Sequence, residues 1–147
     1  MNTLLRPKVL LNKNEVEIAA SASFVRDSLN DDGSTPNYGS LNSSPDIIPR
    51  QNSVNPSQVQ QLFGAATYNQ DTGQQIEYGQ SNYIYLRANN PTNAAVNASI
   101  SVYWSRPSTL QYPSQWQQNI IGTSQPLTIP ANTVLAAAQP AIWTPLQ

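Results

Sequence analysis

The sequence predicts an all-β sandwich, and three observations favour this fold class. Two runs, 83–88 and 99–105, alternate apolar and polar residues with the period of two that is typical of half-buried strands. Shorter apolar runs recur along the chain between turn residues, which include 12 prolines and six glycines. The 147 residues are enough for one domain with a core of its own.

Four short candidate strands lie in the first third of the chain. Residues 9–11 and 15–18 are β-compatible, and 23–26 form a third piece that runs into a loop rich in Asp, Asn and Gly at 27–36. Residues 46–48 lie between two prolines. This flanking predicts an edge strand, because proline cannot donate to a ladder.

A long irregular connection, residues 49–75, contains one short helical segment. Asn55 is a suitable N-cap, Pro56 suits the first turn and Gly64 suits the end of a helix. The pattern predicts one or two helical turns over 55–64.

Residues 81–105 are interpreted as two adjacent strands joined by a polar turn at 89–93. In the first strand, Tyr83, Tyr85 and Arg87 lie on the face opposite the apolar residues. In the second, the apolar residues lie opposite serines and Tyr103. The predicted core residues are Ile84, Leu86, Ile100, Val102 and Trp104, with Trp104 as the central tryptophan between two sheets.

A loop at 107–118, rich in proline and glutamine, precedes the closing strands. These are expected at 120–121, at 127–129, from Val134 through the alanine run, and at 142–143. Residues 16–147 are therefore assigned to a single sandwich domain. Residues 1–15 are assigned to an N-terminal arm or first strand, which would either extend the same sandwich or pair with the edge of a neighbouring subunit.

The composition narrows the possible classes of function. The chain has no cysteine and no histidine, which removes thiol chemistry and the commonest residue for proton transfer and metal ligation. Only 10% of the residues are charged, against about 25% in an average protein. The net charge of −1 predicts no nucleic-acid binding.

The N-terminal apolar residues are interrupted by Arg6, Pro7 and Lys8, which predicts neither a signal peptide nor a membrane span. We therefore expect synthesis in the cytoplasm, followed by a surface or extracellular role that is reached through a non-classical or contractile-type export route.

Several short motifs follow one another along the chain. They are Arg26-Asp27-Ser28, Asp31-Asp32-Gly33, Ser44-Pro45-Asp46-Ile47, Glu77-Tyr78-Gly79-Gln80, Asn82-Tyr83-Ile84-Tyr85-Leu86-Arg87, Val102-Tyr103-Trp104 and Ile142-Trp143-Thr144-Pro145. Their order resembles that of bacterial CARDB-like domains, a family related to cell adhesion. The resemblance implies an immunoglobulin-like β-sandwich that acts as a spacer or interaction unit without catalysis of its own. The chain departs from the family pattern in its Asn89-Asn90-Pro91 turn and in the insertion at 49–75.

An aromatic face is the main candidate binding site. If the two strands of 81–105 pair, the rings of Tyr83, Tyr85 and Tyr103 form one surface bounded by Arg87, suited to a protein partner or a sugar. Tyr112 and Trp116, from the loop at 107–118, are further candidates for the same role. In the alternative interpretation, the connection at 49–75 buries the rings as a second core and Trp116 folds back over the end of the sandwich.

The acidic loop is a candidate calcium site. Asp27, Asp31 and Asp32, with Asn30, offer the hard oxygen ligands that Ca²⁺ prefers, but no glutamate closes the loop as in an EF-hand. The alternative is that these side chains make ordinary turn hydrogen bonds to the backbone. No other cofactor is expected.

Together these patterns predict a non-catalytic structural or interaction module. It would associate with itself or with another protein in a bacterial surface, secreted or injected assembly. The alternative function is a carbohydrate-binding module that uses Tyr83, Tyr85 and Trp116. A hydrolase would need a carboxylate pair such as Glu15 and Glu17, which more readily form a solvated strand face.

Overall fold

The computed structural model describes residues 6–11, 23–33, 44–105, 114 and 117–146. Over these residues the chain is mostly strand, arranged in antiparallel sheets, with one short α-helix. The prediction of a strand-dominated chain with a single short helix is confirmed at this level.

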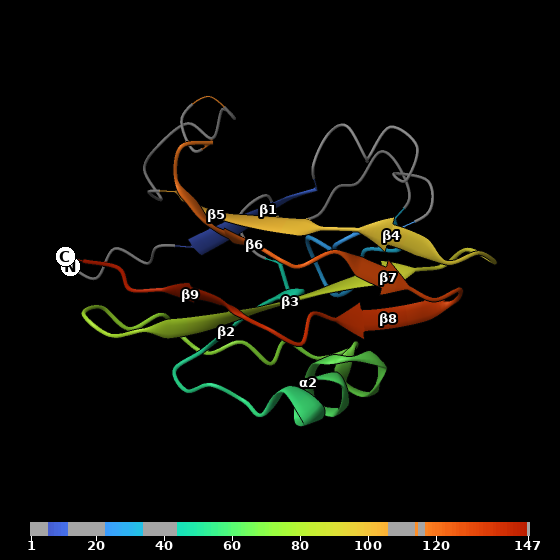
Figure 1. Ribbon diagram of the computed structural model, residues 1–147, viewed down its shortest axis with the longest axis horizontal. Coiled ribbons are helices and arrows are strands. Elements are labelled where there is room, and N and C mark those ends of the chain that lie inside the picture. The colour runs from blue at the N-terminus through green and yellow to red at the C-terminus, as the bar shows by residue number, and fades with distance from the viewer. Residues whose placement is uncertain (1–5, 12–22, 34–43, 106–113, 115–116, 147) are drawn as a thin grey trace.

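The strands form two layers (Figure 1). In the first layer the order is β1-β5-β6, and a two-stranded ladder of β4 and β7 continues this layer. The elements of this layer are β1 (Arg6–Leu11), β4 (Val96–Ala98), β5 (Ile100–Ser105), β6 (Ile120–Thr123) and β7 (Leu127–Ile129). β1 pairs with β5 over its whole length, so the predicted arm contributes a strand to the body of its own chain.

The second layer is built around the long central strand β3. β2 pairs with residues 83–86 of β3, while β9 and β8 pair with its first and last residues respectively. The elements of this layer are β2 (Ile47–Arg50), β3 (Asn82–Asn90), β8 (Thr133–Ala136) and β9 (Ala141–Trp143). Phe24 adds one isolated bridge to Asn89, which is all that the predicted strand at 23–26 contributes.

The main core lies between the two layers. Four of the five predicted core residues, Ile84, Leu86, Ile100 and Val102, are fully or almost fully buried in it. Trp104 is half-buried instead, and its ring stacks on that of Trp143 with the centroids 6.3 Å apart. The period-two pattern thus identified the inward face of both β3 and β5.

A second, smaller core lies on the other face of β3. The helix α2 (Pro56–Phe63) and the 3-10 turn η1 (Ala65–Thr67) belong to the connection between β2 and β3, and α2 covers the outer face of the second layer (Figure 1). The buried residues of this core are Ile48, Val59, Phe63, Tyr85 and Ala136. The predicted helix is confirmed, with Asn55 accepting a hydrogen bond from the amide of Ser57 as the N-cap.

The expected pairing of the two strands in 81–105 is wrong. β3 pairs with β2, β8 and β9, whereas β5 pairs with β1 and β6, so the two strands lie in different layers. Asn90 fixes this crossing: its buried side-chain amide donates to the carbonyl oxygens of Ala94, Ile129 and Pro130. These bonds tie the end of β3 to the end of β7 in the opposite layer. They replace the tight turn that a hairpin would need.

Candidate functional site

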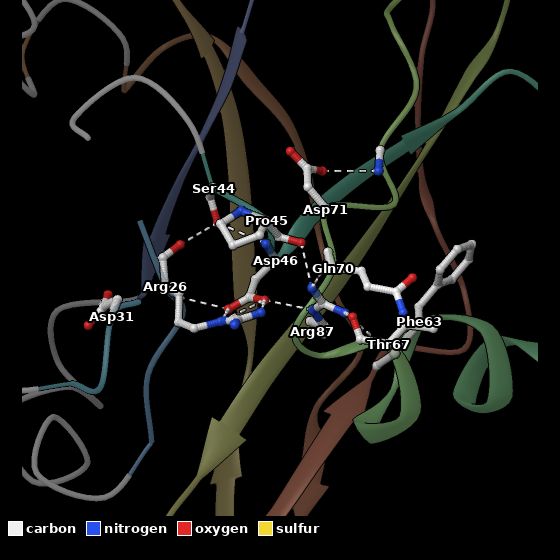
Figure 2. Close-up of polar contacts among 12 residues, drawn as sticks. Arg26, Asp31, Ser44, Pro45, Asp46, Phe63, Thr67, Gln70, Asp71 and Arg87 are labelled. Carbon is white, nitrogen blue, oxygen red and sulfur yellow. Dashed lines mark hydrogen bonds and ion pairs between the residues drawn. The ribbon is translucent and has the colours of Figure 1, made fainter. Parts of the chain in front are cut away.

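Three charged side chains form a buried cluster next to the central strand. Arg87 of β3 and Asp46, just before β2, have no exposed surface, and Arg26 is only 2% exposed. Nε of Arg87 donates to Oδ1 of Asp46 over 2.6 Å, and Nη2 of Arg26 donates to the same oxygen over 2.7 Å (Figure 2). One carboxylate is therefore shared by two guanidinium groups.

Arg87 uses all of its hydrogen-bond donors inside the protein. Besides Nε, each of its two terminal nitrogens donates two hydrogen bonds, which accounts for the five N–H groups of a guanidinium. The acceptors are the backbone carbonyls of Pro45 (2.9 Å), Phe63 (3.3 Å), Thr67 (3.1 Å) and Gln70 (3.0 Å). Arg87 thereby binds the C-terminal end of α2 and η1, where carbonyls without helical partners favour a cation.

Asp46 joins the loop that contains Arg26 to the central strand. Its Oδ2 accepts from the backbone amide of Arg26 over 2.8 Å, and its own carbonyl accepts from the amide of Arg87 over 3.1 Å. Ser44 extends the link, since its hydroxyl donates to the Arg26 carbonyl and accepts from the Asp46 amide. Each charge of the cluster is thus held by several partners, which offsets the cost of burying it.

Tyr68 covers one side of the cluster. The guanidinium carbon of Arg26 lies 3.4 Å from the centroid of its ring, and that of Arg87 lies 5.4 Å away, as in cation–π contacts. Burial, together with the nearby Asp46 carboxylate, raises the pKa of Tyr68 to about 12, although Arg26, the Asn89 side chain and Arg87 act in the opposite direction.

This arrangement fits a structural clamp. Arg87 has no donor left for a substrate, and both carboxylate oxygens of Asp46 are engaged by arginine or by backbone amide. Chemistry on a ligand would need at least one of these groups to face an open site. The cluster instead joins four separate parts of the chain: the loop around residue 26, the start of β2, β3 and the end of α2.

The prediction of a binding role is wrong for two residues, because both are buried. Tyr85 and Arg87 have no exposed surface, so neither can offer a face to a sugar or a partner. The ring of Tyr85 lies 4.9 Å from that of Phe63 under α2, and its hydroxyl accepts from the amide of Val54. The connection at 49–75 covers them, which is the alternative that the sequence left open.

Tyr83 and Tyr103 do not share a surface. Tyr83 is half-buried on β3 and lies opposite Ile142, whereas Tyr103 is half-buried on β5 in the other layer and lies opposite Ile120. The predicted aromatic face depended on pairing between β3 and β5, which does not occur. Tyr112 and Trp116 lie outside the described residues.

The acidic loop is organised by turn hydrogen bonds. The two carboxylate oxygens of Asp31 accept from the backbone amides of Asp27 (3.1 Å) and Gly33 (2.8 Å). Gly33 has a φ of 81°, which a glycine adopts without strain. Within the part of the chain that the structure describes, Asp27 and Asp32 do not join Asp31 in a group of three potential metal ligands.

Two outer strands, β6 and β9, lie next to each other, one from each layer. They approach closely at Gly122, where an added Cβ would lie 3.0 Å from the Cβ of Ala141. Each strand exposes an isoleucine: Ile120 on β6 is 52% exposed and Ile142 on β9 is 59% exposed. Residues 107–147 contain no Lys, Arg, Asp or Glu, so neither strand carries a charge.

The other edges of the second layer are closed by glutamine residues. Gln60 of α2 donates from its side-chain amide to the Val134 carbonyl (2.8 Å) and accepts from the Ala136 amide (3.0 Å), so it occupies the outer edge of β8. On the opposite side, the backbone amide of Gln74 donates to the Pro49 carbonyl of β2 over 2.8 Å. Covering a sheet edge in this way prevents unwanted strand pairing.

Sequence reasoning missed several of these residues as parts of a site. In the cluster, Asp46 is 20 positions from Arg26 and 41 positions from Arg87, and charged side chains are otherwise rarely buried. Gln60 lies on an exposed helix surface, where a glutamine carries no particular signal. Asp46 and Arg26 stood out only within the motifs that resemble CARDB-like domains.

No family model, curated protein sequence or solved structure matches this chain. Among the residues that the structure describes, no helix has the length and apolar character needed to cross a membrane.

Proposed function

We propose that this chain is a non-catalytic structural module that self-associates within a larger protein assembly. The observation that carries this proposal is the character of β9, an uncharged outer strand that exposes Ile142. Soluble proteins usually protect edge strands with charges, bulges or covering segments, because an open edge pairs with other chains. An uncharged, apolar edge therefore favours association.

The saturated clamp supports the non-catalytic part of this proposal. The buried charged side chains of the described residues are Arg26, Asp46 and Arg87, and each is engaged with protein groups. Their contribution is to hold α2 and the loop around residue 26 on the central strand. A rigid arrangement of the strands suits a module that pairs with other chains in an assembly.

We propose further that the two layers form an immunoglobulin-type sandwich. The two antiparallel layers around one core support it, as does the motif order that resembles CARDB-like domains. Domains of that family serve as spacers or interaction units in bacterial surface and secreted proteins, and we propose the same setting here. Burial of Tyr85 counts against the alternative of sugar binding, since stacking on a sugar ring requires an exposed aromatic face.

The test is the mass of the full chain in solution as a function of concentration, measured by sedimentation or light scattering. We expect the average mass to rise with concentration. Because β9 contains no charged side chain, added salt should leave this rise unchanged. A mass equal to that of one chain at every concentration would contradict self-association.

A further inference from the structure

We infer that the outer edge of β9 pairs in antiparallel fashion with β9 of a second copy of this chain. This inference rests on the proposed self-association and names its interface. It follows from the direction of backbone groups along β3, from the way in which the other edges of the layer are closed, and from the absence of charge in the last quarter of the chain.

The hydrogen bonds of β3 fix the direction in which the backbone of β9 points. The amide of Arg87 donates to Asp46 on the β2 side, whereas the carbonyl of Leu86 accepts from Ala137 on the other side. Successive residues of an antiparallel strand alternate between its two neighbours. Tyr83 therefore bonds toward β2, and Ile142, which lies opposite Tyr83, directs its own N–H and C=O away from β3.

The rest of this edge is already occupied. Gln60 supplies a donor and an acceptor to β8, the neighbouring part of the same edge, and thereby takes the place of a pairing strand. Gln74 blocks the opposite edge at Pro49. Ile142, at the centre of β9, differs from the other described edge positions of the second layer. Its backbone N–H and C=O point outward, and its apolar side chain is exposed.

A second copy is the occupant that this edge fits best. Two identical strands related by a twofold axis pair in antiparallel fashion, so each Ile142 amide would donate to the Ile142 carbonyl of the other copy. Residues 107–147 contain no charged side chain, so β9 itself brings no like charges together and calls for no oppositely charged partner. The pairing would also cover Ile142 and bring Leu146, which is 81% exposed, close to the partner chain.

Two prolines limit the length of the pairing. Pro140 and Pro145 bracket β9, and proline interrupts a ladder because it lacks an amide hydrogen. The paired stretch is therefore short, and an interface of this size is weak and reversible. A twofold axis closes the contact after two chains, so a dimer is expected instead of a fibre.

Sedimentation velocity of the full-length wild type and two matched variants tests this interface. Ile142→Lys places a charge at the centre of the inferred contact, where two copies would bring like charges together. Ile120→Lys places the same charge on an isoleucine of similar exposure in the other layer. We expect Ile142→Lys to weaken dimerisation at least about tenfold and Ile120→Lys to change it by less than about twofold.

Amide hydrogen exchange gives a second measurement on the unmodified protein. The Ile142 amide should exchange more slowly as the concentration rises, because in the dimer it is hydrogen-bonded. Thermal unfolding followed by circular dichroism should show that both variants are folded. Wild type that dimerises, with Ile142→Lys dimerising equally well, would overturn the inferred interface but leave self-association intact. Wild type that stays monomeric would overturn both.

Discussion

Nε of Arg87 donates to Oδ1 of Asp46 over 2.6 Å, and neither side chain has any exposed surface. This contact joins the centre of β3 to the residue before β2, across 41 positions of sequence. Since Asp46 also binds Arg26, the pair determines how three segments meet on one side of the second layer. Its loss should therefore affect the whole fold and not only its immediate surroundings.

Replacing Arg87 by methionine should lower the free energy of unfolding by about 3–5 kcal/mol. The substitution keeps most of the side-chain volume but leaves the carbonyls at the end of α2 without their donor and Asp46 with one arginine only. Urea unfolding followed by circular dichroism measures this loss. Arg50→Met is the matched control: Arg50 is half-buried and donates to a single carbonyl, that of Thr72, so its loss should cost about 1 kcal/mol. Equal losses in the two variants would contradict a clamp centred on Arg87.

Replacing Gln60 by alanine should destabilise the protein by about 1–3 kcal/mol, because two hydrogen bonds to β8 are lost. The Val134 carbonyl and the Ala136 amide would then be left without their side-chain partner. The opened edge should also increase aggregation during refolding. Gln61→Ala is the matched control on the same helix, since Gln61 is exposed. If refolding yields and unfolding midpoints are the same for both variants, Gln60 does not protect this edge.

The stability of the protein should fall between pH 10 and pH 12 in a way that depends on Tyr68. Burial raises its pKa from 10.0 to about 12, so the folded state holds the phenolic proton more tightly than the unfolded state does. Stability from this group is fully present below pH 10 and is lost as the pH rises through about 12. Unfolding free energies measured across this window should decline less steeply for Tyr68→Phe than for wild type. Equally steep declines for the two proteins would show that folding does not raise the pKa of Tyr68.

Replacing Asn90 by aspartate should cost at least about 2 kcal/mol. The new carboxylate would have the shape of the amide but no hydrogens, and it would face the carbonyl oxygens of Ala94, Ile129 and Pro130. Asn93→Asp, in the same connection but exposed, is the control and should change stability by less than about 0.5 kcal/mol. Thermal melts at neutral pH suffice for this comparison, and equal melting temperatures would contradict the role of Asn90 in the crossing between layers.

The alternation of residues in β3 and β5 was enough to identify their inward faces, because a period of two directly reflects strand geometry. The helix at 56–63 could be predicted as well, since Asn55, Pro56 and Gly64 act through local backbone chemistry. These features need no knowledge of distant residues, which is why the sequence was sufficient for them.

The clamp and the topology could not be predicted in this way. Arg87 lies on the outward face of β3, as its alternation indicates, but its burial depends on α2 covering that face and on Asp46 lying nearby. A turn-rich connection such as 89–93 suits a hairpin and a crossing between layers equally well. Hydrogen bonds from Asn90 to the distant Ile129 and Pro130 favour the crossing, and such long-range contacts are invisible in local patterns.

The pairing of two β9 strands can be tested most directly by a single cysteine. The chain contains no cysteine, so Ile142→Cys introduces a unique thiol at the inferred twofold axis. Residues paired by two hydrogen bonds across antiparallel strands have Cα atoms about 5.5 Å apart, which is within the range that a disulfide spans. Under mild oxidation Ile142→Cys should form a covalent dimer much faster than Ile120→Cys, and denaturant should abolish the difference. Equal rates for the two variants under native conditions would contradict the pairing.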